Sequence, residues 1–428
     1  MATTIPVRRT ATIPWRDRRV GLHQAFTGVL TLVALAGALV WAYQVREGLV
    51  VTGMRDIASW GVYISFFMWF IGLSAGGLIV ASAASILRVE RLAPLARPAI
   101  VVAFVAVALG GVAIIPDIGR PERLWHLFRY PNWSSPMVWD VIVILAYGAL
   151  SLVYLWFHTR VDLARRGSWL AFGTQASAEA EERSERVAHR IAWVAFPLAI
   201  ALHSITAWIF GLQASRPLWF GAILAPFFIT SALVSGLGLV LVTVLALRRR
   251  RLVEADDATV GWLGGLLAGF IFVDLFLLVA ELVTAYWSGL PEEHLNFDAL
   301  VTGKYWWAFW GQVVLEVGAM ALMLSPRRRA RTGLVAVAGA MAMVGILFKR
   351  LGLVLVGFLY PLMDAAPGAV VGEIAETTPT GIPLTGAFAT EASYVPTWAE
   401  YVIVAGLLAV AVLGIDFAAR HLPLRRRS

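Results

Sequence analysis

Long apolar runs recur along the whole 428-residue chain, and this pattern indicates a bundle of membrane helices. A helix needs about 20 mostly apolar residues to cross the hydrocarbon core of a bilayer. Inside lipid, backbone polar groups must be satisfied within their own segment, so runs of this length are expected to be helical. About ten spans meet the criterion, and we expect them near residues 22–43, 57–87, 97–116, 138–158, 190–210, 219–247, 260–287, 304–324, 332–360 and 397–420. The predicted fold class is an all-α integral membrane protein.

The composition fits lipid and limits the chemistry that the chain can carry. Only 14% of its residues are charged, against about 25% in an average soluble protein. The sequence contains no cysteine, so an iron–sulfur cluster with thiolate ligands would have to sit on a partner. A transmembrane haem usually needs paired axial histidines, and His203 is the one histidine expected well inside a span. We therefore expect neither haem, nor iron–sulfur cluster, nor metal site in this chain.

Clusters of basic residues mark every second connector between the expected spans. They lie in the N-terminal tail, at 88–97, at 160–166, at 248–251, at 327–331 and in the C-terminal tail. The positive-inside rule places such connectors in the cytoplasm. We therefore expect both termini to be cytoplasmic, with a retained N-terminal tail, and the alternate connectors to be extracytoplasmic. This placement accounts for the net charge of +8 without any binding of nucleic acid.

Two runs of small residues suggest an internal repeat. Residues 66–77 and 227–238 both begin with paired phenylalanines, continue through Ser, Ala and Gly, and precede a basic helix end. Small residues let membrane helices approach closely, and ligands often bind between such repeats. We predict four regions: a tail with the first helix (1–56), a first four-helix bundle (57–218), a second four-helix bundle (219–360), and an extracytoplasmic arm with the last helix and a basic tail (361–428).

Two connectors differ from the rest in composition. Residues 161–189 are rich in Ala, Glu, Arg and Ser, which indicates either a short amphipathic cytoplasmic helix or a mobile linker. Residues 361–396 are rich in Pro, Gly, Thr and Ala, which indicates an extended extracytoplasmic cover or a partner-binding arm.

The connector 117–140 is the most complex in chemical terms. Acidic, basic and aromatic side chains crowd into it, including Asp117, Arg120, Glu122, Arg123, Trp125, His126 and Arg129. A connector that only has to turn needs none of them, and such loop residues often carry function. We interpret it as a docking and reaction surface at the membrane face. The alternative is that its charges keep a loop in water while its tryptophans mark the interface.

Several ionisable residues are expected inside the spans of the second bundle. They are Asp274, Glu281, Glu316, Lys349 and Arg350. Such groups are costly in lipid unless they are paired or hydrated. Asp274 and Glu281 are seven residues apart and therefore share a helix face. One interpretation is a proton route through the bundle, and the other is a set of static ion pairs that fixes the packing.

Three stretches of the chain point together to one family. They are residues 70–77 (FIGLSAGG), residues 117–121 (DIGRP) with Trp125, His126 and 135–140 (SPMVWD), and residues 203–213 (HSITAWIFGLQ). They resemble the NrfD/PsrC family, the haem-free membrane subunits of quinone-linked respiratory complexes. Residues 348–350 and 396–400 also resemble that family, and the resemblance runs from about residue 20 to about residue 420.

The resemblance implies a function. Members bind quinone or quinol, menaquinone or ubiquinone, near the extracytoplasmic face. An iron–sulfur subunit resembling four-cluster ferredoxins docks there and connects to a molybdopterin catalytic subunit or a multihaem cytochrome. The chain is thus expected to be the quinone-linked subunit of an oxidoreductase in a bacterial or archaeal cytoplasmic membrane, with proton translocation left open.

The resemblance also suggests roles for single residues. His203, His126 and Tyr63 are candidates to bond the quinone oxygens. Asp117 or Asp140 is the candidate to take a proton, because quinol oxidation needs a base within hydrogen-bond reach.

Arg120 is a candidate to stabilise negative charge on the quinone, and Trp125 is a further candidate for quinone binding.

Two other classes of protein remain as alternatives. A secondary transporter or proton channel would also show many spans, a repeat and buried charges. A passive membrane anchor for a soluble enzyme would need only the spans.

Overall fold

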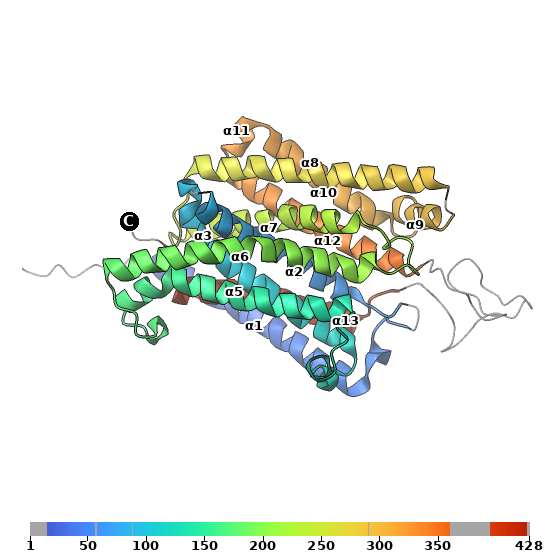
Figure 1. The fold of residues 1–428 in the computed structure, drawn as a ribbon, viewed down its shortest axis with the longest axis horizontal. Coiled ribbons are helices and arrows are strands. Elements are labelled where there is room, and N and C mark those ends of the chain that lie inside the picture. The colour runs from blue at the N-terminus through green and yellow to red at the C-terminus, as the bar shows by residue number, and fades with distance from the viewer. Residues whose placement is uncertain (1–14, 56–57, 88, 290, 360–393, 426–428) are drawn as a thin grey trace, which may run out of the picture.

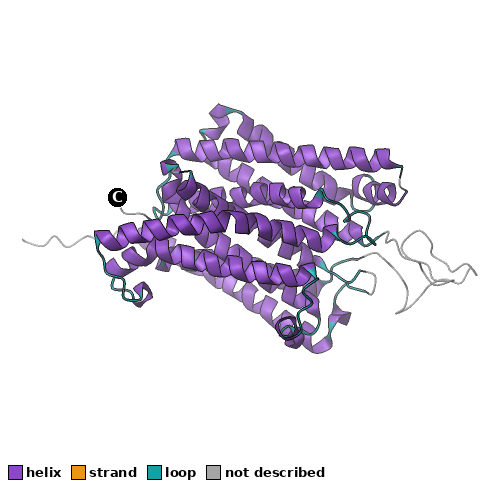
Figure 2. Ribbon diagram, viewed as in Figure 1, coloured by secondary structure: helices purple, strands orange, loops and turns teal. Residues whose placement is uncertain are grey.

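The computed structural model describes residues 15–55, 58–87, 89–289, 291–359 and 394–425, and the regular elements in these ranges are helices (Figure 1 and Figure 2). Ten of them are long and apolar enough to cross a membrane. In chain order these are α1 Trp15–Glu47, α2 Val62–Ile86, α3 Ala93–Ile114, α5 Pro136–Arg165, α6 Ala178–Gly211, α7 Leu224–Arg249, α8 Asp257–Ser288, α10 Trp306–Leu324, α12 Thr332–Gly357 and α13 Trp398–His421. Shorter α-helices are α4 His126–Arg129, α9 Pro291–Val301 and α11 Pro326–Arg329. The prediction of an all-α integral membrane protein is confirmed.

The helices lie side by side, and their connectors gather at two opposite ends of the bundle (Figure 1). One end, here called the loop end, carries residues 48–55, 58–61, 115–135, 212–223 and 291–305. The other, here called the arginine-rich end, carries residues 89–92, 166–177, 250–256 and 325–331. Between the two ends, large apolar side chains of α1, α8 and α10 face outward, as helices in contact with lipid require.

The second membrane helix, α2, is the centre of the packing, and nearly all of its residues are buried. It packs against α3, α6, α7 and α12. The helices α2, α3, α5 and α6 pack on one another and are here called the first group. The helices α7, α8, α10 and α12 do the same and are here called the second group. Outside these groups, α1 packs along α13, which in turn packs against α3.

The contact between α2 and α7 uses the small residues of the expected repeat. A Cβ atom added to Gly76 would lie 2.0 Å from the backbone carbonyl carbon of Gly236, and one added to Gly236 would lie 2.3 Å from the backbone nitrogen of Gly76. A side chain at either position would therefore push the helices apart. The division of the chain into two repeated bundles stays a prediction, because helix contacts also run between the two groups.

Residues 161–189 differ from the expectation of a separate helix or a linker. The helix α5 continues to Arg165 and α6 begins at Ala178, so most of the stretch extends the two membrane helices. Asp162 anchors this extension, because its carboxylate lies 2.7 Å from Arg97 of α3 and 3.0 Å from Arg165. The charged residues of this stretch, whose composition is also typical of a solvated linker, form ion pairs with one another and with α3. The N-terminal tail before residue 15 and most of the predicted arm over 361–396 lie outside the described residues.

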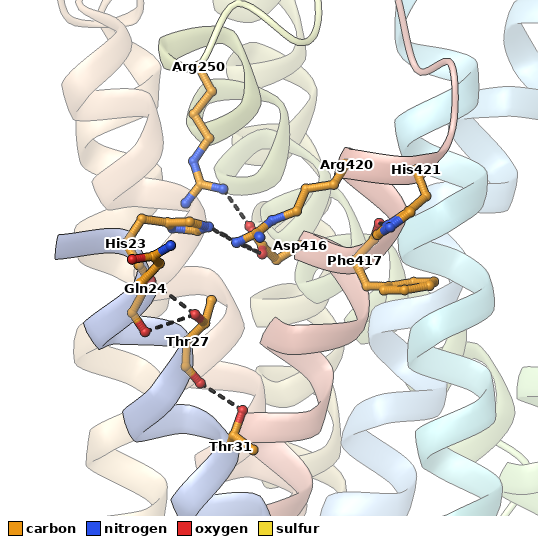
Figure 3. Close-up of polar contacts among 9 residues, drawn as sticks. All are labelled: His23, Gln24, Thr27, Thr31, Arg250, Asp416, Phe417, Arg420 and His421. Atoms are coloured by element: carbon orange, nitrogen blue, oxygen red, sulfur yellow. Dashed lines mark hydrogen bonds and ion pairs between the residues drawn. The ribbon is translucent and has the colours of Figure 1, made fainter. Parts of the chain in front are cut away.

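A charge cluster ties the outer helices α1 and α13 to the rest of the bundle at the arginine-rich end (Figure 3). The carboxylate of Asp416 on α13 accepts a hydrogen bond from Arg250 at 2.6 Å and forms an ion pair with Arg420 at 2.7 Å. His23 of α1 lies 3.5 Å from the same carboxylate. Because Arg250 follows α7, one acid connects three separate parts of the chain.

Candidate functional site

A cavity of about 750 Å³ opens between α2, α3, α5 and α6 at the loop end. Residues 115–128 cover it, since Leu124, Leu127 and Phe128 contribute to its wall. Aliphatic and aromatic side chains make up most of the remaining wall, including Trp60, Phe67, Phe104, Val107, Ile144, Leu145 and Phe210. The shape and the apolar wall suit a hydrophobic ligand. Two ionisable residues stand out in the lining, Asp117 and Asp140.

Asp117 belongs to a tight turn at the end of α3. The turn spans Ile115–Ile118 and contains Pro116, which fixes the backbone angle there. The Oδ1 atom of Asp117 accepts a hydrogen bond of 2.9 Å from the backbone N–H of Gly61. Gly61 directly precedes α2, and the N-terminus of a helix favours a negative charge. The turn thus places one carboxylate where the start of α2 and the cavity meet.

Asp140 lies in the second turn of α5, which begins at Pro136. The hydroxyl group of Thr206 on α6 donates a hydrogen bond of 2.6 Å to its Oδ1 atom. Asp140 is only 2% exposed although it lines the cavity. Neither this carboxylate nor Asp117 has a cation among the ion pairs of the described residues. Neutral donors therefore hold both acids in the wall of the cavity.

Tyr63 lies behind the wall of the cavity and supports the turn that carries Asp117. Its hydroxyl group donates a hydrogen bond of 2.6 Å to the side-chain oxygen of Gln44. The amide nitrogen of Gln44 in turn donates a hydrogen bond of 2.6 Å to the carbonyl oxygen of Pro116. The network links α1, α2 and the turn after α3, and Tyr63 is fully buried within it.

A second network holds the start of α2 from the other end of the chain. The backbone N–H of Val62 donates to the Tyr394 hydroxyl at 2.7 Å, and that hydroxyl donates to Glu400. Glu400 also accepts hydrogen bonds from the backbone N–H groups of Gly53 at 2.7 Å and Thr397 at 2.9 Å. Burial and the adjacent Glu400 carboxylate raise the pKa of Tyr394, so the phenol keeps its proton.

His203 lies within α6 and does not line the cavity. Its Nδ1 atom is 2.7 Å from the carbonyl oxygen of Ala199, and its Nε2 atom is 3.1 Å from the carbonyl oxygen of Ile71 on α2. Both ring nitrogens thus face backbone acceptors. The structure places this histidine between α6 and α2, behind the cavity rather than in its wall.

Three other predicted residues lie on the outer surface of the loop end. Arg120, Trp125 and His126 are exposed and do not line the cavity. The ring of His126 packs edge-on against Trp125, with 4.3 Å between the ring centroids, and against Tyr130 at 5.8 Å. Phe128 of the same segment both lines the cavity and is 63% exposed. The connector therefore has one face toward the cavity and another toward the outside of the protein.

The second group carries the buried charges that were expected there. The Lys349 ammonium group donates to both carboxylate oxygens of Asp274, at 2.8 and 2.7 Å. Thr230 donates a further hydrogen bond of 2.9 Å to Asp274. The Lys349 ammonium also lies 3.2 Å from the centroid of the Phe227 ring. A cation and an anion at the middle of α8 and α12 thus satisfy each other.

Arg350 and Glu316 lie beside that pair. The Arg350 guanidinium donates to the Ser231 hydroxyl and lies 3.7 Å from the centroid of the Phe228 ring. Both carboxylate oxygens of Glu316 are buried, and the side chains of Gln312 and Asp274 lie next to them. A cavity of only about 50 Å³ reaches this region, and its lining includes Glu281, Gln312, Lys349 and Arg350. The structure therefore brings all five predicted residues into one region.

The described part of the chain contains no group of three or more His, Asp or Glu side chains suited to hold a metal ion. The sequence carried no signal for Gln44, Thr206 or Tyr394 as partners of the predicted site. It did carry a signal for Glu400 as a helix cap, because a Thr-x-x-Glu spacing before an apolar run is typical of a capping box. Thr397 and Glu400 do form that box at the start of α13.

The family model described as "Polysulphide reductase, NrfD" matches residues 50–361 of this sequence, which include the first group, the cavity and the second group. The chain belongs to the NrfD/polysulphide reductase family. The resemblance seen in the sequence is thereby confirmed.

Relatives within the NrfD family are membrane subunits of reductases. The chain is 39% identical to a putative dimethyl sulfoxide reductase membrane subunit of Halobacterium salinarum, over 95% of this chain and 92% of that protein. It is 26% identical to a selenate reductase subunit of Mesobacillus selenatarsenatis, over 81% of this chain and 85% of the relative. It is 25% identical to the Hdr-like menaquinol oxidoreductase integral membrane subunit of Archaeoglobus fulgidus, over 91% of each.

Proposed function

We propose that this NrfD-family chain binds quinone or quinol in the first-group cavity and passes electrons between the quinone pool and an iron–sulfur subunit docked at the loop end. The observation that carries the proposal is a largely apolar cavity with two carboxylates that have no cation partner among the described residues. Its volume of about 750 Å³ lies within the usual range for ligand pockets, about 300–1,000 Å³. The name of the Archaeoglobus relative, which includes menaquinol, supports the same ligand.

The two carboxylates supply the proton chemistry of the proposed reaction. Oxidation of a quinol releases two electrons and two protons, and reduction of a quinone takes up the same. Asp117 and Asp140 are the groups in the cavity wall that can accept or return these protons. The Gly61 N–H and the Thr206 hydroxyl each hold one carboxylate oxygen in place. The electrons leave to, or arrive from, the docked iron–sulfur subunit.

Tyr63 and His203 are positioning residues in this proposal, because each acts through another group. Tyr63 holds Gln44, which holds the turn that carries Asp117. His203 contacts the carbonyl oxygen of Ile71 and stands one helix turn before Thr206, the partner of Asp140. Mutating either residue should displace a carboxylate rather than remove a ligand atom.

The partner subunit would dock on the outer face of the loop end. Exposed aromatic side chains gather there, including Trp125, Phe128, Tyr130 and Trp133. Arg120, Arg123 and Arg129 lie exposed among them. Aromatic residues and arginines are the groups most enriched at protein interfaces. We place this end outside the cytoplasm because basic connectors mark the opposite end.

A proton route through the second group is a further part of the proposal. Glu316 is a buried acid next to Asp274 and Gln312, and Lys349 pairs with Asp274 close by. Chains of buried ionisable residues are typical of proton relays in membrane proteins. In this route Asp274, Glu281 and Glu316 exchange protons, while Lys349 and Arg350 set the balance of charge.

Direct binding of a short-chain naphthoquinone to the purified full chain tests the main proposal. Ala108 of α3 lines the cavity, so Ala108→Phe should fill it and weaken binding at least tenfold. Ala321→Phe, at an exposed position of α10, is the matched control and should bind normally. Absence of binding by the native chain would overturn the proposal. Equal binding by both variants would move the site elsewhere.

Copurification separates the proposal from the two rival classes. A respiratory subunit should copurify with a protein that shows iron–sulfur absorbance, which this cysteine-free chain cannot supply. A transporter should purify alone. A passive anchor should copurify with the iron–sulfur protein, but quinone-site inhibitors should not affect electron transfer in its complex.

A further inference from the structure

One face of α5 carries a polar stripe that crosses the whole membrane. Its members are Asp140, Tyr147, Ser151, Tyr154, His158 and Asp162. Steps of seven, four, three, four and four residues keep them on one side of a helix. With about 1.5 Å of rise per residue, the stripe is about 33 Å long, close to the thickness of the hydrocarbon core. Lipid-facing residues need no such pattern, and all but His158 are buried inside the protein.

The stripe connects two cavities at opposite ends of the first group. Asp140 lines the cavity described above, at the loop end. His158 and Asp162 line another cavity of about 400 Å³ at the arginine-rich end. The lining of this second cavity is rich in ionisable and hydroxyl groups, including Ser85, Glu90, Arg97, Glu181, Ser184, Glu185 and His189. Such a wall favours water, in contrast to the apolar wall of the first cavity.

Polar groups of α2 and α6 face the half of the stripe that is nearer the arginine-rich end. The stripe and these groups together are here called the column. The Tyr154 hydroxyl donates to the carbonyl oxygen of Ala81 at 3.2 Å. The Ser85 hydroxyl lies 3.4 Å from the Nδ1 atom of His189. Ser82 of α2 is fully buried, and its hydroxyl oxygen has no hydrogen-bond partner among the described residues. An orphaned hydroxyl inside a membrane bundle requires an explanation, and a water molecule in the column would satisfy it.

The half of the column that is nearer the loop end continues to Asp140. The Ser151 hydroxyl donates to the Tyr147 carbonyl oxygen at 2.8 Å, and the Tyr147 hydroxyl donates to the Ser74 carbonyl oxygen at 2.8 Å. The Ser74 hydroxyl and the His203 ring both contact the carbonyl oxygen of Ile71, at 2.7 and 3.1 Å. His203 is followed one turn later by Thr206, which donates to Asp140. Buried hydroxyl and imidazole groups thus recur along the full length of the column.

We propose that this column is the proton route between the arginine-rich side of the membrane and Asp140. The inference rests on the proposed function, because Asp140 must exchange a proton during quinone chemistry. Each hydroxyl that donates to a carbonyl retains lone pairs for a proton from a neighbouring group, and bridging water closes the remaining gaps. For each quinone reduced, two protons enter from the arginine-rich side while two electrons arrive from the partner. Quinol oxidation sends both in the opposite direction.

Accessibility of single cysteines tests whether water reaches the column. The native chain has no cysteine, so each introduced thiol is the only one. Sealed vesicles holding the full chain would be treated from either side with Ag⁺, and protection from later fluorophore labelling would be measured. Ser85→Cys in the second cavity and Ser82→Cys in the column should react from the arginine-rich side only. Ser65→Cys, on α2 beside Arg350 and outside the column, is the matched control and should react from neither side.

This result does not depend on quinone. Failure of Ser82→Cys to react, or its reaction at the same rate as Ser65→Cys, would overturn the route while leaving the quinone proposal intact. Absence of naphthoquinone binding by the native chain would instead overturn the proposed function.

The Tyr154→Phe variant tests proton transfer in the purified complex. Removal of the hydroxyl should slow quinone-linked electron transfer about tenfold, since water replaces a positioned relay only in part. The kinetic solvent isotope effect should rise, and the affinity for naphthoquinone should not change. Tyr401→Phe, exposed on α13, is the control for loss of a tyrosine hydroxyl. An unchanged rate and isotope effect in Tyr154→Phe, with normal binding of naphthoquinone, would overturn the route.

Discussion

The first helix group holds Asp117 and Asp140 beside a large cavity, and the second group holds Asp274 beside a cation. Asp117 and Asp140 receive hydrogen bonds from neutral donors and line a cavity of about 750 Å³. Asp274 instead receives two hydrogen bonds from Lys349, and the cavity near it measures about 50 Å³. Both groups are built from four membrane helices that pack on one another.

The difference shows that buried acids in one protein can have different roles. A carboxylate with a cation partner is already compensated, and the cavity of about 50 Å³ near Asp274 is too small for a drug-sized ligand. A carboxylate held by one neutral donor keeps a free oxygen for a substrate. In the proposed function the two groups therefore have separate tasks: the first binds a large apolar molecule, and the second holds buried charges in lipid.

The largest expected effect comes from breaking the ion pair of the second group. Lys349→Met leaves Asp274 as an uncompensated buried charge, and loss of one partner of a buried pair costs about 3–5 kcal/mol. The free energy of unfolding, measured by denaturant titration in detergent, should fall by that amount. The double variant Lys349→Met/Asp274→Leu should recover most of the loss. A single variant as stable as the native chain would show that the pair does not hold the second group together.

The next effect separates chemistry from stability in the first group. Asp117→Asn and Asp140→Asn keep the shape of the side chain but remove a base, so quinol-dependent electron transfer by the complex should fall about 100-fold. Naphthoquinone affinity and unfolding should stay close to native. Glu47→Gln, at an exposed position of α1, is the control. If both variants kept native rates, the carboxylates would have no part in the reaction.

The boundary between the groups should show a smaller effect. Gly76→Ala places a methyl group against the Gly236 backbone, and overpacking of this kind costs about 1–3 kcal/mol. Gly269→Ala is a matched control in α8, because no atom lies within 4 Å of its added Cβ. The unfolding temperature of Gly76→Ala should therefore be lower than that of Gly269→Ala. Equal unfolding temperatures would mean that α2 and α7 can move apart without loss.

The smallest effect concerns the support behind the cavity. Tyr63→Phe removes the hydrogen bond to Gln44, and one such bond contributes about 1 kcal/mol. Electron transfer should fall only a fewfold, since Asp117 keeps its bond to Gly61. A loss as large as that of Asp117→Asn would instead make Tyr63 part of the reaction itself.

The sequence was sufficient to predict the spans. All ten predicted spans correspond to helices, because the length of an apolar run follows from the thickness of the bilayer. The connector that begins at Asp117 stood out by its charged and aromatic residues, and apolar residues of this connector line a cavity; its role as a reaction surface stays a prediction. Asp274 and Glu281 share a helix face because they are seven residues apart, whereas the packing of α8, α10 and α12 brings Glu316, Lys349 and Arg350 to the same region.

The sequence could not show which polar groups face the cavity. Asp140 and Thr206 are 66 residues apart, and Gln44 and Pro116 are 72 residues apart, so only tertiary packing pairs them. His203 shares its helix face with Thr206, yet its ring turns to the carbonyl oxygen of Ile71. The extension of α5 and α6 over residues 161–189 was also unpredictable, because the partner of Asp162 is Arg97 of a distant helix.

The bonds from Tyr394 and Glu400 to Val62 and Gly53 have a consequence for biosynthesis. A ribosome makes residue 400 long after α2 has entered the membrane, so the backbone groups at the start of α2 wait for their caps until translation is almost over. A nascent chain released early would keep α2 uncapped next to Asp117. Any chain that ends before residue 394 would therefore lack both of these bonds at the entry to α2.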